Sequence, residues 1–185
     1  MNLKDALAEI SGHSAGGSPF LIAFGLSFVG TATLSYQMTE ETTALIAVFQ
    51  GGIALPLSLW LEKKIGWQQM SANNPLRRLS MLLAFSQMMF VPALVVLFNV
   101  NPRVIPVVLT GLAGIHFAPY AWLHQTNIYL LLAIVLSAGG FLLQLWLGSG
   151  AFHINLLFIG IAYLIAAPLV YLQAVKMTQQ SVATA

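Results

Sequence analysis

Six long stretches of this sequence contain no Asp, Glu, Lys or Arg, and this feature limits the possible folds more than any other. Each stretch has about 17–22 residues, the length that an α-helix needs to cross the hydrocarbon core of a bilayer. Long unbroken apolar runs favour helices, because a membrane β-barrel would show short segments of alternating polarity. The six predicted transmembrane helices cover residues 20–37, 43–61, 79–100, 104–122, 127–147 and 154–175.

Composition points to the same class of protein. Only 6% of the 185 residues are charged and 58% are hydrophobic, whereas soluble domains carry about 25% charged residues. We therefore predict an all-α integral membrane protein in which residues 1–185 form a single six-helix bundle. The sequence contains no cysteine, which excludes disulfides and thiolate chemistry within it.

The basic residues indicate how the bundle is oriented. If the N-terminus is cytoplasmic, all but one of the seven Lys and Arg residues are inside and only Arg103 is outside. This distribution follows the positive-inside rule and predicts that both termini are cytoplasmic. The residues on the cytoplasmic side are Lys4, Lys63, Lys64, Arg77, Arg78 and Lys176.

The only sizeable loop, residues 62–78, has basic ends and contains Trp67. This pattern suits a segment on the inner leaflet, where basic side chains contact anionic lipid headgroups. The alternative is a plain connector whose charges act only as a topology signal. The predicted headgroup contacts are Lys63, Lys64, Arg77 and Arg78.

Residues 1–19 carry mixed charges and do not resemble a cleaved signal peptide. Leu3, Leu7 and Ile10 share one face at helical spacing, which predicts a short N-terminal interfacial helix. The glycines of residues 11–19 favour turns. We expect a flexible joint there, before the first span.

The two halves of the sequence show a weak similarity. Three predicted spans precede the turn at residues 101–103 and three follow it. "GGIALPLSLWL" from Gly51 parallels "GGFLLQLWL" from Gly139. This pattern is typical of a 3+3 inverted repeat, as in transporters, although two apolar sequences also match through composition alone.

Each predicted span carries at least one uncharged polar residue near its middle. Buried amides and imidazoles are costly against lipid, so we expect these side chains to face one another or a hydrated cavity. His116 and Tyr120 are four residues apart and share a helical face. The predicted solute pathway comprises His116, Tyr120, Gln50, Gln87, Tyr163, Ser27 and Ser137.

Three roles are open for His116 and Tyr120: hydrogen bonding between helices, lining a solute path, or direct chemistry. Prolines interrupt four of the spans and free backbone carbonyls, which helps to build a polar pocket. The other histidines are interpreted as terminal or loop residues, and three tyrosines as interfacial belt residues. These are His13, His124 and His153, and Tyr36, Tyr129 and Tyr171. No histidine pair has metal-ligand spacing, and we expect no metal or other cofactor.

Two functional hypotheses follow. The first is a small transporter or permeation protein for a neutral or weakly polar solute. The second is a non-enzymatic membrane module that binds a partner protein, a second copy of the chain, or lipids. No nucleophile or second titratable group accompanies His116 and Tyr120, so we expect no enzymatic activity. Small size and short loops favour a bacterial inner membrane, and basic residues that flank spans predict no nucleic-acid partner.

Overall fold

The computed structural model describes residues 2–183, and this part of the chain contains helices and no strand. The predicted all-α class is therefore confirmed for the described residues. The elements, with η for a short 3-10 helix, are α1 (Leu3–His13), η1 (Ala15–Gly17), α2 (Ser18–Leu34), α3 (Glu40–Phe49), α4 (Gly51–Ile65), α5 (Arg77–Ser86), η2 (Gln87–Phe90), α6 (Val91–Val100), η3 (Pro102–Val104), α7 (Ile105–Leu123), α8 (Asn127–Leu147), η4 (Gly148–Gly150) and α9 (Ala151–Ala183).

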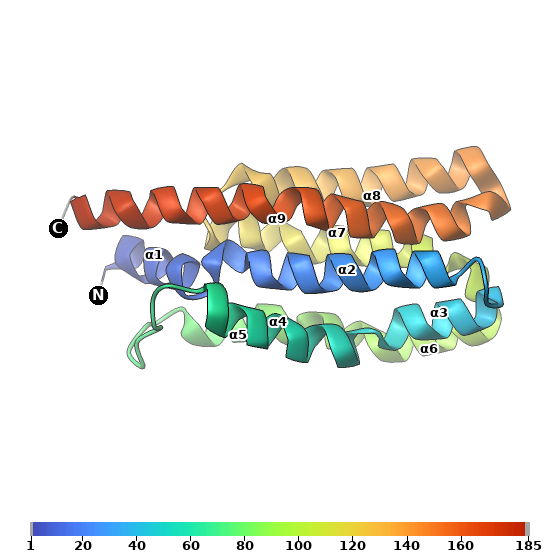
Figure 1. The fold of residues 1–185 in the computed structure, drawn as a ribbon, viewed down its shortest axis with the longest axis horizontal. Helices are drawn as coiled ribbons and strands as arrows, with labels where there is room; N and C mark the ends of the chain where they lie inside the picture. Colours follow the sequence, from blue (N-terminus) through green and yellow to red (C-terminus); the bar gives the residue numbers. More distant parts are fainter. Residues whose placement is uncertain (1, 184–185) are drawn as a thin grey trace.

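Five helical segments within the described residues are long and apolar enough to cross a membrane. They are Ala15–Leu34, Glu40–Ile65, Arg77–Val100, Pro102–Leu123 and Asn127–Gln180. The last has 54 residues and holds α8 and most of α9, which lie side by side after the turn at η4 (Figure 1). A helical protein that can span a membrane is thus supported, while six crossings and an inverted repeat stay predictions.

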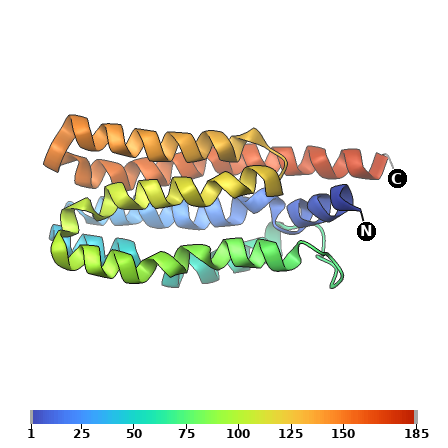
Figure 2. The ribbon, with the colours of Figure 1, turned by 180° about the vertical axis from the view of Figure 1, so that it is seen from behind.

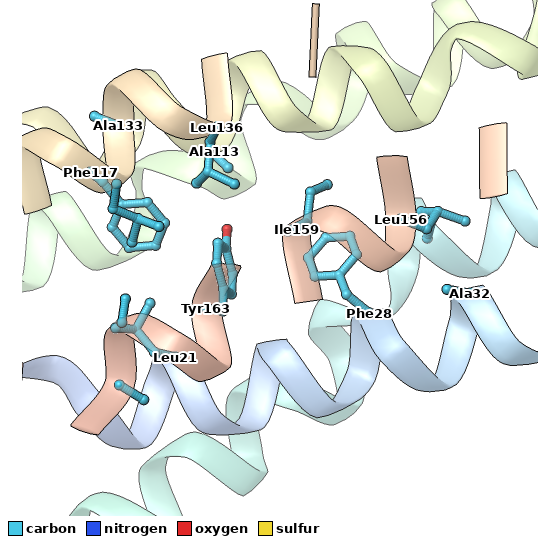
Figure 3. Packing of buried hydrophobic residues seen from close by; sticks show 14 of the residues in the cluster. Leu21, Phe28, Ala32, Ala113, Phe117, Ala133, Leu136, Leu156, Ile159 and Tyr163 are labelled. Atoms are coloured by element: carbon cyan, nitrogen blue, oxygen red, sulfur yellow. The ribbon is translucent and has the colours of Figure 1, made fainter. Parts of the chain in front are cut away.

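The helices form two layers along one long axis (Figures 1 and 2). α9 packs against α2, α7 and α8, and these four helices contain most of the core. α3 to α6 lie along one side of that group, with α4 packed on α2. Figure 3 shows Phe28 of α2, Phe117 of α7 and Tyr163 of α9 in the core. The Tyr163 ring centroid lies 5.9 Å from that of Phe28 and 5.2 Å from that of Phe117.

Two of the apolar segments are broken near their middle, and a glutamine lies at each break. α3 ends at Phe49 and α4 begins at Gly51, so Gln50 lies between them. In the next segment the 3-10 helix η2 begins at Gln87 and separates α5 from α6. A 3-10 stretch inside a longer helix often marks a functional hinge. By contrast, α7 and α9 continue through their internal prolines, Pro119 and Pro168.

The helix predicted at the N-terminus is present as α1, but it is partly enclosed by the bundle. Its residues 6–12 are buried, and the helix packs on α9 and α7. The flexible joint expected after it is instead a buried turn. Gly16 and Gly17 there have φ angles of 67° and 82°, which favour glycine. The Tyr129 hydroxyl donates a hydrogen bond to the Gly16 carbonyl at 2.6 Å.

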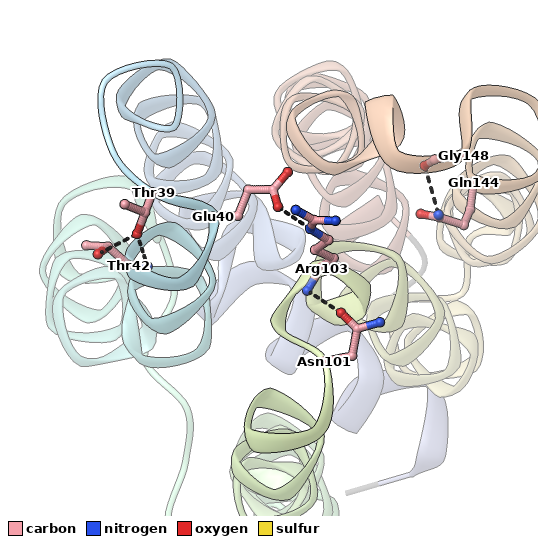
Figure 4. A network of polar contacts seen from close by, with 7 residues as sticks. All are labelled: Thr39, Glu40, Thr42, Asn101, Arg103, Gln144 and Gly148. Carbon is pink, nitrogen blue, oxygen red and sulfur yellow. Dashed lines mark hydrogen bonds and ion pairs between the residues drawn. The ribbon is translucent and has the colours of Figure 1, made fainter.

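The opposite end of the bundle is held by polar contacts at helix termini (Figure 4). The Arg103 Nε lies 2.5 Å from a Glu40 carboxylate oxygen and links η3 to α3. The Thr39 hydroxyl accepts a hydrogen bond from the Thr42 N–H and caps α3. η3, which contains Arg103, joins α6 to α7 at this end, away from α1, the 66–76 loop and the C-terminal part of α9, which lie together at the other end (Figures 1 and 4).

Small residues let α7 and α8 approach closely. A Cβ atom on Gly114 would lie 1.9 Å from the Ser137 Oγ and 2.6 Å from the Ala133 carbonyl oxygen. A Cβ atom on Gly140 would lie 2.0 Å from the Thr110 Oγ1. Small residues at such contacts are typical of helix pairs in membranes.

Candidate solute cavity

A cavity of ≈ 390 Å³ lies between the α2/α7 side of the core and the layer formed by α4, α5 and η2. This volume is within the range of about 300–1,000 Å³ that is usual for small-molecule sites. Most of its wall is apolar and includes Phe24, Phe85 and Met88. The cavity is also lined by uncharged polar side chains from several different helices.

Five of the seven residues predicted to form a solute pathway line this one cavity. They are Gln50, Gln87, His116, Tyr120 and Tyr163. The other two do not line it. Ser137 lies at the α7/α8 contact, next to Gly114, and Ser27 lies on α2 away from the cavity wall. The structure thus brings most of the predicted set together.

The two glutamines have polar atoms without hydrogen bonds in the described part of the chain. The Gln50 side chain is 8% exposed, and its Oε1 accepts a 3.3 Å hydrogen bond from the Thr31 hydroxyl. Its Nε2 is buried and has no partner among residues 2–183. The Gln87 amide also makes no hydrogen bond to the described residues. Both glutamines therefore retain amide donors without a partner in the described chain.

His116 and Tyr120 form the middle of an aromatic row on α7. The His116 Nδ1 lies 3.2 Å from the Ser86 Oγ, which connects α7 to α5. Its ring centroid lies 5.1 Å from that of Tyr120. The hydroxyls of Tyr120 and Tyr163 line the cavity without a hydrogen-bond partner in the described chain. His116 therefore makes one hydrogen-bond contact that connects two helices. The two tyrosine hydroxyls are available to bind a solute.

His124 lies in the turn between α7 and α8, in agreement with its interpretation as a loop residue, but its side chain is buried. Its side chain is 4% exposed, it lines the cavity, and its Nδ1 lies 3.0 Å from the Ser11 Oγ. Its ring stacks on Tyr120 at a centroid distance of 5.9 Å. Burial lowers the pKa of His124 to about 4, so it is neutral at pH 7. The sequence contains a signal for this arrangement, because His116, Tyr120 and His124 are four residues apart and so share one helical face.

Tyr129 is not a belt residue, because it is 1% exposed and lines the cavity. Its ring lies between those of Phe117 and His124, with centroid distances of 5.7 Å and 5.4 Å. The hydrogen bond to Gly16 explains why it turns inward near the start of α8. That bond depends on a turn more than a hundred residues earlier in the chain, and no local sequence pattern indicates it.

Two ionisable side chains line the end of the cavity that faces the 66–76 loop. Glu62 is half-buried on the last turns of α4, and His13 is half-buried at the end of α1. The predicted second span ends at residue 61, whereas α4 continues to Ile65. A carboxylate therefore lines this end of the cavity, one residue beyond the predicted span. Deeper in the cavity, the polar lining residues are uncharged.

The 66–76 loop is fastened to α1 by one carboxylate. The Glu9 side chain accepts hydrogen bonds from the Ser71 N–H and hydroxyl and from the Asn74 Nδ2. Burial acts to raise the pKa of Glu9, but these hydrogen bonds outweigh it, so the net pKa lies below the usual range. Glu9 is therefore ionised at neutral pH. The predicted headgroup residues Lys63, Lys64, Arg77 and Arg78 are exposed on either side of this loop.

No group of three His, Asp or Glu side chains that could hold a metal ion occurs within residues 2–183. The fold and cavity define an all-helical protein with apolar helices able to cross a membrane and an internal site with uncharged polar walls. The chain belongs to the DUF7010 family, a family of unknown function, whose model matches residues 3–173. No curated protein and no solved structure matches it significantly.

Proposed function

We propose that this protein is a small transporter or permeation protein for a neutral or weakly polar solute. The proposal includes six membrane crossings, cytoplasmic termini and a bacterial inner membrane. Its main support is the group of uncharged hydrogen-bonding side chains that line one cavity, among which the Gln50 Nε2 has no partner in the described chain. Amide, phenol and neutral imidazole groups bind hydroxyl and carbonyl oxygens, and a charged solute would lack a counter-ion among them.

The energetic cost of Gln50 separates this proposal from a purely structural one. A buried donor without a hydrogen bond costs about 1–3 kcal/mol. A glutamine that only joined helices would have both ends paired, whereas Gln50, which lines the cavity, uses its Oε1 and leaves its buried Nε2 without a partner in the described chain. A loss of folding stability at such a position is typical of a site that binds a ligand.

The test is solute flux into liposomes that contain the purified protein, with glycerol, urea and acetamide as probes. We expect Gln50→Met to reduce the flux of the transported solute about tenfold and to leave the thermal unfolding midpoint unchanged or higher, because it removes an unpaired buried amide. Ser27→Ala is the matched control, since Ser27 lies mid-helix outside the cavity wall. Equal flux in wild type and Gln50→Met, or no protein-dependent flux at all, would contradict the proposal.

The second candidate is a non-enzymatic module that binds a partner protein or lipids. The observation that favours it is the low burial of one segment: α5 and η2 bury no residue within the described chain. Such a segment has apolar surface available for another membrane helix. This candidate predicts that one protein, or a second copy of the chain, co-purifies stoichiometrically in mild detergent. A monomeric species without a partner would count against it.

The proposal also includes the absence of enzymatic activity. His116 lies beside Ser86 and Tyr120, and none of the described acidic side chains contacts it. General acid–base catalysis on lipid needs a positioned nucleophile or a second group of matched pKa. Incubation with radiolabelled bilayer phospholipids should therefore give no product. Hydrolysis or headgroup transfer that depends on His116 would contradict this part.

A further inference from the structure

We propose that the cavity opens sideways into the bilayer between α4 and α5, and that it takes a lipid-soluble amphiphile with an uncharged hydroxyl or carbonyl group. This inference rests on the site of the proposed function and names its substrate class and route of entry. It follows from the way the cavity wall is built, from the depth of the opening and from the order of apolar and polar residues along it.

The wall is incomplete where α4 faces α5. α4 buries Ala54 and Ser58, and it packs on α2. The next positions along that helix, Leu55 and Leu59, line the cavity. Across the cavity, α5 buries none of its residues. A residue that lines the cavity and is also well exposed marks the opening. Four side chains meet both conditions: Leu59 (43% exposed), Met81 (53%), Phe85 (46%) and Met88 (50%).

We call these four side chains the rim, and their depth places the opening in the membrane. With a rise of 1.5 Å per residue, Leu59 lies about 9 Å from the end of α4 at Ile65. Met88 lies about 16 Å beyond Arg77 at the start of α5. A hydrocarbon core is about 30 Å thick, so the rim extends from below the headgroups to near the middle of the bilayer. It therefore faces acyl chains.

The rim and the rest of the lining differ in exposure and polarity. All four rim side chains are exposed and apolar, and methionine and phenylalanine adapt to flexible apolar groups. Uncharged polar side chains, among them Gln50, His116 and Tyr163, line the same cavity and are buried or half-buried. This difference matches an amphiphile whose chain lies in the opening and whose polar group lies inside.

The same order disfavours the other occupants. A hydrocarbon chain alone would leave the Gln50 donor unpaired, and a sugar would place hydroxyls against the apolar rim. An anionic headgroup would find no Lys or Arg among the residues that line the cavity. The ionisable lining residues are Glu62 and three histidines, of which His124 is neutral at pH 7. A cationic group would find one carboxylate, Glu62 at the end that faces the 66–76 loop, and no acidic side chain elsewhere in the lining. An uncharged polar group therefore fits the inner lining.

The experiment uses a photoreactive diazirine derivative of hexadecanol in phosphatidylethanolamine–phosphatidylglycerol vesicles that contain the full-length protein. Peptide mass spectrometry locates the labelled residues. We expect labels on the rim and on cavity-lining residues of α7 such as His116. Diazirine-labelled hexadecane, which lacks the hydroxyl, should label the cavity at least tenfold less. Equal cavity labelling by both probes, or hexadecanol labels only on lipid-facing residues outside the cavity, would overturn the inference.

Blocking the opening in the folded protein is an independent test of the lateral opening. Because the chain has no cysteine, Phe85→Cys can be purified and then modified with pyrene maleimide at a single position. The modification should reduce cavity labelling by hexadecanol at least tenfold, relative to the same unmodified variant. Val96→Cys is the matched control, because Val96 lies on α6, is 67% exposed and does not line the cavity. Undiminished labelling of modified Phe85→Cys would contradict a lateral opening.

The two proposals can fail separately. One outcome is that modification of Phe85→Cys blocks hexadecanol labelling of the cavity, while no protein-dependent solute flux is found. This outcome would support the lateral site and contradict transport. Gln50-dependent flux of glycerol or urea, with no hexadecanol label in the cavity, would support a water-filled pathway and overturn the lateral opening.

Discussion

A neutral histidine and two tyrosines stack where α7 ends and α8 begins. His124, Tyr120 and Tyr129 have ring centroids 5.4–5.9 Å apart, and the two residues that connect this cluster to the N-terminal segment are Ser11 and Gly16. The aromatic cluster therefore connects the cavity to α1 and to the turn that follows it, η1. Its stability depends on His124 remaining uncharged, because an imidazolium ion would be buried there.

The pH dependence of stability should report this histidine. The pKa of His124 falls from 6.5 to about 4 on folding, so the unfolded chain binds more protons between these values. Stability is therefore highest above pH 6.5 and declines as the pH falls toward 4, by about 3 kcal/mol in all. Thermal unfolding in detergent, followed by tryptophan fluorescence across this range, measures the decline. His124→Gln should make this decline smaller, and an unchanged slope in that variant would contradict the assignment.

At the scale of elements, the α7/α8 contact depends on Gly114. A Cβ atom there would lie 2.6 Å from a backbone oxygen, whereas a Cβ atom on Gly111, one turn earlier on the same helix, meets no atom within 4 Å. We expect Gly114→Ala to destabilise the protein by about 1–3 kcal/mol through overpacking. Gly111→Ala should be neutral or stabilising by up to about 1 kcal/mol, because alanine favours helix. Unfolding midpoints in detergent compare the two, and equal midpoints would contradict the close contact.

The link between α1 and the 66–76 loop is a second element-scale feature. The Asn74 Nδ2 donates to the Glu9 carboxylate at 2.9 Å and to the Ala6 carbonyl at 3.0 Å. Each hydrogen bond to a charged group contributes about 1.5–3 kcal/mol. Asn74→Ala should therefore loosen the loop and speed tryptic cleavage at Arg77 about tenfold in proteoliposomes. The adjacent Asn73 is exposed, so Asn73→Ala should cleave at the wild-type rate, and an equal effect of both variants would refute the link.

For the whole molecule, the arrangement of the ends predicts topology. α1 and the C-terminal part of α9 lie at the same end, and η3, which contains Arg103 and joins α6 to α7, lies at the opposite end (Figure 1). Tags fused to the two termini should therefore be accessible from the same side of the membrane, and we expect that side to be the cytoplasm. A cysteine introduced at Arg103 should react only from the other side. Tags on opposite sides would contradict six crossings.

Sequence reasoning located the helices well, because apolar length is a local property. The predicted span 127–147 matches α8 residue for residue, and most of the other limits lie within a few positions. Five predicted site residues line one cavity for a related reason. Uncharged polar side chains in apolar helices avoid contact with lipid only when they face one another or a cavity. His124 and Tyr129 were missed because their burial depends on α1 and the turn after it, which are distant in sequence.

The breaks at Gln50 and at η2 have a mechanical consequence. They divide two apolar segments, and the halves α4 and α5 bury fewer side chains than the long helices α2, α7 and α8. α4 and α5 can therefore move about these breaks while the other helices remain intact. Amide deuterium uptake should therefore be faster around residues 50–53 and 87–90 than along residues 155–167 of α9, where the ladder is continuous.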